Sequence, residues 1–149
     1  MLNKTKKLQK GFTIIEVLIV LAIAGLILLI VFLAVPALQR NSRNTQRKNE
    51  VAGLLGGVNE WTNNNNGVLP ANATEQAAAL ANTKTQAYSG NVTWKSGAAT
   101  NGTTADTAVI VTGAKCSGPD AVGGSNRQVA LLYSVETGGG TPQKSCTDS

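Results

Sequence analysis

The chain has 149 residues, enough for one domain or for a small head on a long helix. Its formal net charge is +5, but four of its 13 basic residues lie within the first ten positions. From residue 49 onward five basic residues accompany seven acidic ones, which gives no case for a basic nucleic-acid-binding head. The chain has no His, no phosphate-binding Gly-rich loop and only scattered acids. We therefore expect no enzyme active site, no cofactor and no metal site.

The first segment in chain order is short and basic, and a long apolar run follows it. The basic side chains before Gly11 are all lysines, without an acid among them: Lys4, Lys6, Lys7 and Lys10. From Val17 to Val35 every residue is apolar or Gly. As a helix, this run would span about 28 Å, close to the ~30 Å hydrocarbon core of a bilayer. The pattern predicts a membrane-spanning helix over residues 12–35, with a cytoplasmic N-terminus and an external head.

Glu16 is the one ionisable side chain next to this run. A carboxylate inside a membrane helix costs about 2.5–3.5 kcal/mol on insertion scales, so it is a functional candidate by default. The alternative is a carboxylate that lies among lipid headgroups. Position alone leaves both interpretations open.

Taken together, these residues resemble the class III leader of a type IV prepilin. The shared features are the basic segment ending in Gly11, the following Phe12, Glu16 as the fifth residue after the junction, and an apolar helix that begins at once. The resemblance implies that a prepilin peptidase removes residues 1–11 and methylates the new amine of Phe12. It also implies a homopolymer in which Glu16 of an incoming subunit meets the Phe12 amine of a subunit already assembled.

Other N-terminal signals fit less well. A secretory signal peptide has an apolar core of about 7–15 residues and an A-x-A-like cleavage site, whereas this run is longer and no such site follows it. No Cys lies near the run, which excludes a lipoprotein signal. A plain single-pass membrane anchor remains as the alternative.

Beyond the apolar run, the helix is expected to continue to residue 62. Pro36 lacks a backbone donor, so a kink or local opening is predicted near residues 32–36. Arg40, Arg43 and Arg47 then recur at helical spacing, and we expect this stripe to face solvent or headgroups. In a filament it could instead meet acidic groups of neighbouring subunits.

The next part of the helix carries one apolar face, which predicts packing under a sheet. The face consists of Val51, Leu54, Leu55, Val58 and Trp61. The Asn-rich run 63–67, which ends in Gly, should terminate the helix.

The remaining chain, residues 63–149, is expected to form a globular head. A short helix is predicted at 74–81 and a turn at Asn101–Gly102. Strands are predicted at 88–94, 108–112 and 128–136, with a polar tail after the last. Because loops connect these strands, we expect an antiparallel sheet and an α+β fold class, in which the long N-terminal helix packs against a small head. The resemblance to pilins implies the same architecture.

Cys116 and Cys146 enclose the last predicted strand. Two Cys in the head agree with an oxidising, external location. A bridge between them would close a loop of about 30 residues and contribute roughly 3–4 kcal/mol on the chain-entropy model. Many pilins have such a disulfide-bounded loop near the C-terminus, and this spacing is similar. Two free buried thiols are the alternative.

The sequence thus predicts a structural subunit of a type IV pilus, stored in the cytoplasmic membrane and extruded into a surface filament for adhesion or twitching motility. Its partners would be other subunits, the prepilin peptidase and the inner-membrane assembly machinery. The alternatives are a pseudopilin of a type II secretion or competence (DNA-uptake) system, and a membrane-anchored external domain that never polymerises.

Overall fold

The computed structural model describes residues 11–149 except Ser89. The expected basic leader, apart from Gly11, lies outside the described residues. The chain divides into two compact units, Met1–Leu38 and Gln39–Ser149.

The described part of the first unit is dominated by the start of helix α1, which runs from Ile14 to Asn64. Helix α1 is the one helix among the described residues that is long and apolar enough to cross a membrane, and none of its apolar window is buried. Helix α1 runs without interruption through Pro36, near which the sequence predicts a kink or local opening. The α+β fold class with a long, apolar N-terminal helix is confirmed.

The C-terminal end of α1 is set by its Asn-rich run, two residues later than expected. Asn66 and Gly67 have φ angles of 56° and 82°, which leave the right-handed helical region. The amide of Gly67 then donates to the carbonyl of Thr62 at 2.7 Å. A residue without a Cβ adopts this left-handed conformation most easily, so Gly67 closes the helix.

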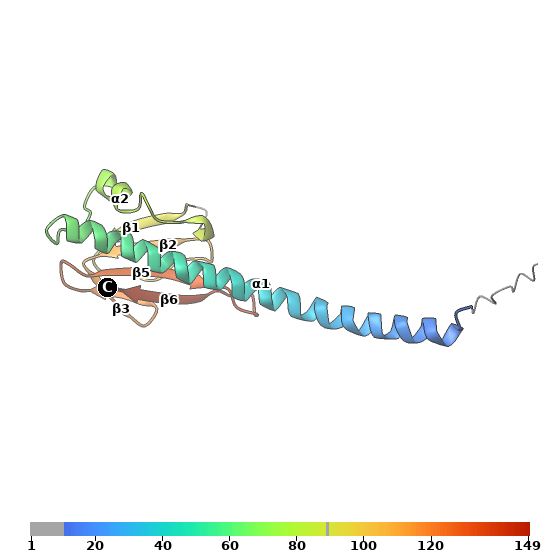
Figure 1. The fold of residues 1–149 in the computed structure, drawn as a ribbon. Coiled ribbons are helices and arrows are strands. Elements are labelled where there is room, and N and C mark those ends of the chain that lie inside the picture. The colour runs from blue at the N-terminus through green and yellow to red at the C-terminus, as the bar shows by residue number, and fades with distance from the viewer. Residues whose placement is uncertain (1–10, 89) are drawn as a thin grey trace, which may run out of the picture. The chain divides into compact units, whose positions relative to one another are not determined.

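The second unit contains a four-stranded sheet with the order β1-β2-β5-β6 (Figure 1). Its strands are β1 (Val92–Ser96), β2 (Ala108–Thr112), β5 (Val129–Val135) and β6 (Gln143–Asp148). Strands β2, β5 and β6 pair antiparallel, as expected. Strand β1, however, pairs parallel with β2, with Val92 opposite Ala108. The expectation of a purely antiparallel sheet is therefore wrong for this edge.

Three strands were not expected from the sequence. Strand β6 lies where a polar tail was predicted, and it pairs with β5 over six residues. Strands β3 (Ala114–Ser117) and β4 (Asp120–Gly123) form a separate antiparallel hairpin. These strands are short and mostly polar, so they lack the apolar alternation that identifies a strand in a sequence.

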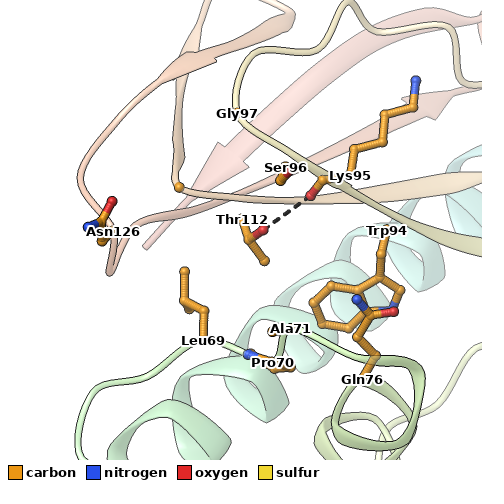
Figure 2. Close-up of a pocket in the computed structure, with 11 residues that line it drawn as sticks. Leu69, Pro70, Ala71, Gln76, Trp94, Lys95, Ser96, Gly97, Thr112 and Asn126 are labelled. Atoms are coloured by element: carbon orange, nitrogen blue, oxygen red, sulfur yellow. Dashed lines mark hydrogen bonds between the residues drawn. The ribbon is translucent and has the colours of Figure 1, made fainter.

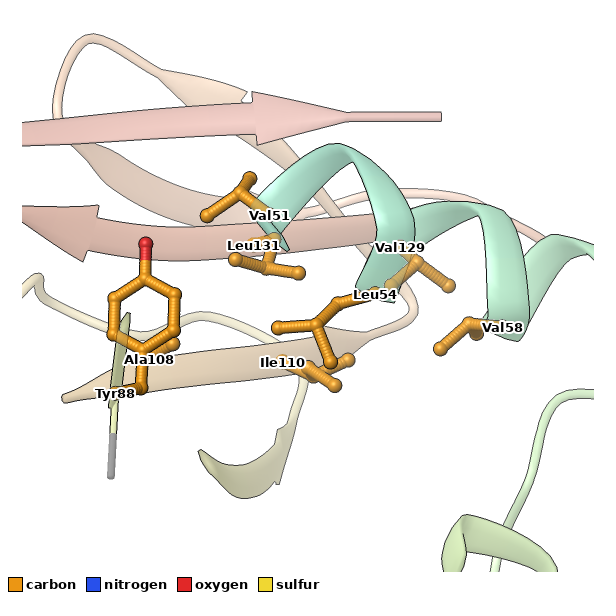
Figure 3. Close-up of a cluster of buried hydrophobic side chains, with 8 residues drawn as sticks. All are labelled: Val51, Leu54, Val58, Tyr88, Ala108, Ile110, Val129 and Leu131. Atoms are coloured by element: carbon orange, nitrogen blue, oxygen red, sulfur yellow. The ribbon is translucent and has the colours of Figure 1, made fainter. Parts of the chain in front are cut away.

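The sheet carries a separate apolar cluster on each face. Ile110, Val129 and Leu131 pack against α1, and the alternate residues of the same strands pack against the β3–β4 hairpin. Figure 3 shows the helix-facing cluster, which comprises Val51, Leu54, Val58, Tyr88, Ala108, Ile110, Val129 and Leu131. The alternation follows from the two-residue period of a strand. The second unit is thus layered as helix, sheet and hairpin.

The connection from α1 to β1 contains helix α2 (Ala73–Ala79) and a 3-10 turn at Gln86–Tyr88. Asn72 caps α2, because its side-chain oxygen accepts from the amide of Glu75 at 3.0 Å. The carboxylate of Glu75 in turn accepts from the amide of Ala71 at 2.8 Å, which lowers the pKa of Glu75 below its usual value.

The connection between β1 and β2 is partly buried and fixes the ends of two other strands. Asn101 is fully buried, and its side-chain amide donates to the carbonyls of Tyr133 on β5 and Ser145 on β6, at 3.2 and 2.9 Å. The hydroxyl of Thr103 meets that of Ser134 at 2.8 Å. This crossover is therefore part of the interior of the head.

Candidate functional site

The N-terminus of α1 is built by reciprocal hydrogen bonds between Thr13 and Glu16. The carboxylate of Glu16 accepts from the backbone amide of Thr13 at 2.8 Å and from its hydroxyl at 2.7 Å. The amide of Glu16 donates to the Thr13 hydroxyl at 3.3 Å. This is a capping box, in which a Thr and a Glu three residues later satisfy each other's backbone donors.

The residues that the sequence predicts to function in processing and assembly, Gly11, Phe12 and Glu16, lie at the start of α1. Gly11 and Phe12 directly precede the capping residue Thr13 and are exposed, with 89% of Phe12 accessible. Phe12, Glu16, Val17, Val20 and Leu21 line a shallow apolar hollow of about 210 Å³. A carboxylate, the predicted cleavage junction at Gly11 and Phe12, and an apolar surface thus lie close together at the start of α1.

Thr13 was not singled out from the sequence, although the signal was present. The pattern Thr-x-x-Glu directly before an apolar run is the signature of a capping box. Glu16 therefore has a local role as a backbone acceptor in addition to its charge.

In the second unit, α1 is held to the sheet by two arginines that share one carboxylate. Arg43 donates from Nε and Nη2 to the two oxygens of Glu136, at 3.0 and 2.6 Å. Arg47 contacts the same carboxylate through Nη1 at 2.8 Å and reaches Asp106 at 3.4 Å. Arg47 is buried, with 4% of its surface accessible. The expectation of a stripe facing solvent or headgroups is wrong for the buried Arg47, whereas Arg43 is exposed as expected. Both arginines contact an acid that follows β5 in the same chain.

Beside the cluster of Arg43, Arg47 and Glu136, the side chain of Asn44 forms two hydrogen bonds with the backbone of Glu136. Its amide donates to the carbonyl of Glu136 at 2.8 Å, and its oxygen accepts from the amide of Glu136 at 2.8 Å. An asparagine on the helix thus pairs with a strand residue as a neighbouring strand would. The ion pairs of the cluster and these two hydrogen bonds therefore hold α1 at the same end of β5.

One turn further, two more buried groups tie α1 to the segment that precedes β1. The carboxylate of Glu50 accepts from the amide of Ala87 at 2.8 Å. The hydroxyl of Tyr88 donates to the carbonyl of Arg47 at 3.1 Å. Buried polar groups carry a cost unless they are hydrogen-bonded, and these contacts offset it.

The cluster shifts the ionisation of its members. Hydrogen bonds from Arg43 and then Arg47 lower the pKa of Glu136 to about 2. The bond to Glu136 also raises the pKa of Arg43 above its ordinary value. Burial raises the pKa of Tyr88, so its hydroxyl stays protonated and able to donate.

The two cysteines form a disulfide that joins the hairpin to the edge of the main sheet. Cys116 on β3 and Cys146 on β6 have Cα atoms 5.8 Å apart. The carboxylate of Asp148 accepts from the amide of Cys116 at 2.7 Å next to the bridge. No group of three or more potential metal-ligating side chains occurs among the described residues.

Comparison with known families identifies the N-terminal region. Residues 6–32 match the model of the prokaryotic N-terminal methylation motif, so the chain carries the class III leader of type IV pilins. The motif indicates a pilin-like or pseudopilin protein with a structural role. Neither the curated proteins nor the solved structures gave a match to the chain.

Proposed function

We propose that this chain, which carries the class III leader of type IV pilins, is a structural subunit that polymerises through α1 into a type IV pilus. The alternative is a pseudopilin of a type II secretion or competence system, whose subunits share this leader. The disulfide that secures the C-terminal strand favours the pilus subunit, since many pilins have a disulfide-bounded C-terminal loop.

The observation that carries the proposal is the exposed apolar surface of α1 next to the methylation motif. Phe12 and nearly all large apolar residues from Ile14 to Leu38 are exposed. Soluble monomers rarely present a contiguous apolar surface of this extent. Lipid can cover the surface before assembly, and neighbouring copies of α1 can cover it afterwards. The same surface thus serves as a membrane anchor and as a filament core.

Processing supplies the charge that Glu16 needs. Cleavage between Gly11 and Phe12 creates an ammonium group at the N-terminus of Phe12, and methylation retains its charge. A lone carboxylate and a lone ammonium in hydrocarbon each carry a desolvation cost of several kcal/mol. Pairing between neighbouring subunits offsets both costs and fixes the axial register of helices that could otherwise slide.

Thr13 provides hydrogen-bond donors for Glu16 before the subunit assembles. In the unassembled subunit, the carboxylate of Glu16 is satisfied by the amide and hydroxyl of Thr13. The carboxylate therefore need not remain without a partner in the membrane. On assembly it turns toward the Phe12 ammonium of the neighbouring subunit, where opposite charges make a stronger hydrogen bond.

The proposed organisation follows from these roles. Residues 1–11 form the leader that the peptidase removes, and residues 12–35 cross the cytoplasmic membrane or line the filament core. Residues 63–149 form the head, which lies outside the membrane and coats the filament. The assembly partners are further copies of the chain, the prepilin peptidase and the inner-membrane machinery.

The test is to shear surface filaments from cells, image them and weigh their subunits by intact-mass spectrometry. We expect a subunit that begins at a methylated Phe12 and contains one disulfide. Filaments that lack this chain, or a mature form that keeps Met1–Gly11, would contradict the proposal.

A further inference from the structure

One groove of the head lies beside the parallel edge of the sheet, far along the chain from the residues assigned to assembly. It has a volume of about 740 Å³, within the range of about 300–1,000 Å³ that is typical of small-molecule sites. It is lined by the segment Leu69–Ala71, by α2, by the ends of β1 and β2, and by the loop before β5. Nothing in the proposed assembly mechanism uses it.

The parallel pairing of β1 and β2 creates this groove. Because the strands run in the same direction, their carboxyl ends, at Ser96 and Thr112, reach the same rim of the sheet. The amide of Gly97 donates to the carbonyl of Thr112 at 2.9 Å, and the hydroxyl of Thr112 donates to the carbonyl of Lys95 at 3.2 Å. In doubly-wound α/β sheets, ligands bind beside the carboxyl ends of the parallel strands, and the two strand ends at this groove have the same relative direction.

The groove combines an aromatic surface with neutral polar groups. In Figure 2, the indole of Trp94 and the amide of Gln76 lie on one side, Leu69 and Asn126 lie on the other, and Thr112 lies between them. Trp94 and Gln76 are only partly buried, and Asn126 is exposed. Trp94 also packs against the core cluster, so Trp94 and Gln76 are each accessible to a ligand in part, whereas Asn126 is exposed.

The scarcity of charged residues in the lining indicates which classes of ligand the groove can bind. No carboxylate lines the groove, and Lys95 is its single charged residue. Figure 2 shows the Lys95 side chain extending away from the centre, where Thr112 lies. A cationic ligand would need an acidic partner, and a phosphorylated ligand would need several basic donors. Neither requirement is met by this lining.

We propose that this groove binds a short neutral saccharide. A pyranose ring has an apolar C–H face that packs on an indole, and hydroxyl groups at its rim that both donate and accept hydrogen bonds. The amides of Gln76 and Asn126 donate and accept in the same way, so each can pair with two neighbouring hydroxyls. The volume of about 740 Å³ and the exposed position of Asn126 suit a short chain of sugar units rather than a buried monosaccharide.

An extended peptide is the competing occupant, because β1 is an edge strand that could add another strand. The lining groups are concentrated at the carboxyl end of β1 and not along its length. A peptide that pairs with the edge would leave Gln76 and Asn126 unused. The side chains thus favour the saccharide.

Fluorescence titration of the full chain tests this proposal. The protein is kept in a zwitterionic detergent without a sugar headgroup, and Trp61→Phe leaves Trp94 as the single indole. The probes are three neutral tetrasaccharides: cellotetraose, maltotetraose and tetra-N-acetylchitotetraose. We expect saturable quenching or a shift of the Trp94 emission by at least one probe, with a Kd of about 0.1–1 mM, as suits an open groove with few hydrogen bonds.

Substitutions at the groove give the decisive comparison. Gln76→Ala and Asn126→Ala should each weaken binding about 5–10-fold, because each removes one hydrogen-bonding group. Gln143→Ala, at an exposed amide of β6 outside the groove, should leave the affinity unchanged. An unchanged affinity in the Gln76→Ala/Asn126→Ala double variant would overturn the site. Absence of saturable binding by all three probes up to about 10 mM, or preference for an extended peptide, would overturn the ligand class. The readout is independent of filament formation.

Discussion

Arg43 and Glu136 form a two-pronged ion pair although 93 positions separate them in the sequence. Arg47, one turn further along α1, contacts the same carboxylate at 2.8 Å. A single acid at the end of β5 thus joins two successive turns of the helix to the sheet. The stability of the head should depend on this carboxylate more than on any exposed acid.

Replacement of Glu136 by Gln tests this dependence. The variant leaves the buried guanidinium of Arg47 with Asp106 at 3.4 Å as its remaining acidic partner. We expect the free energy of unfolding to fall by about 2–3 kcal/mol, because removal of one partner leaves a buried charge poorly compensated. Urea unfolding of the full chain, followed by the near-ultraviolet signal of the head, measures the change. Glu60→Gln, at an exposed position of the same helix, should change it by less than about 0.5 kcal/mol, and equal losses would refute the role of the cluster.

The same carboxylate should give the head a characteristic response to acid. Its pKa is about 2 in the folded protein, below the value of about 4.3 for an unfolded Glu. Stability from this group is therefore fully present above about pH 4.3 and is lost as pH falls toward 2. Between pH 5 and 2, Glu136→Gln should lose stability less steeply than the wild type. Parallel pH profiles of the unfolding free energy in the two proteins would contradict the assignment.

In Glu16→Gln, the side chain keeps its shape but loses its charge. We expect membrane insertion and cleavage after Gly11 to persist, and filaments to fall at least about tenfold, because the Phe12 ammonium loses its partner. Glu16→Asp should be intermediate, since its shorter arm reaches less far. Electron microscopy and quantification of sheared pili, in cells without a wild-type copy, provide the measurement. Normal pili from Glu16→Gln cells would show that this carboxylate does not determine assembly.

Thr13→Val removes the hydroxyl that caps α1 and keeps the side-chain volume. The first turn should lose about 1 kcal/mol of capping energy, and Glu16 should lose one of its two donors from Thr13. We expect fewer filaments at unchanged subunit abundance, while Thr13→Ser, which retains the hydroxyl, should assemble as the wild type does. Equal filament counts in the Val and Ser variants would remove Thr13 from the mechanism.

The Cys116–Cys146 disulfide should stabilise the C-terminal half of the head. Cys116→Ser should lower the free energy of unfolding by roughly 3 kcal/mol, and subunit abundance should fall with it. Hydrogen exchange should speed up in β3, β4 and β6, while the amides of α1 change little. Ready alkylation of both thiols in the native, unreduced protein would contradict this prediction.

The helix of this protein was readable from its sequence because local patterns determine it. The apolar stretch, the Asn-rich terminus and the face with Val51, Leu54 and Val58 all depend on neighbours within a few turns. These three residues are buried against the sheet as the periodicity predicted. Leu55 and Trp61, assigned to the same face, lie at its margin and are only partly buried.

The arrangement of the strands in the head was harder to predict from the sequence, because it depends on pairing between residues that are far apart along the chain. Alternating apolar residues locate β2 and β5 but carry no information on whether β1 runs parallel or antiparallel to its neighbour. Strand β6 is polar because it lies at the edge of the sheet. The stripe of arginines could not reveal its partner, since Glu136 is nearly a hundred positions away. The groove proposed to bind a saccharide could not be predicted either, because it forms only where the carboxyl ends of the parallel strands β1 and β2 meet.

The buried crossover has a practical consequence for anyone who wishes to display a foreign peptide on this protein. Residues 97–107 look like a permissive surface loop, yet an insertion there would pull Asn101 away from the two strands that its amide joins. The turn at Gly138–Gly140 is exposed, and the position of a Cβ on Gly139 has no neighbour within 4 Å, whereas that on Gly138 lies 3.1 Å from Nη1 of Arg40. An epitope tag or vaccine peptide inserted after Gly139 would therefore leave the buried crossover intact, and the subunit could carry it without rebuilding its interior.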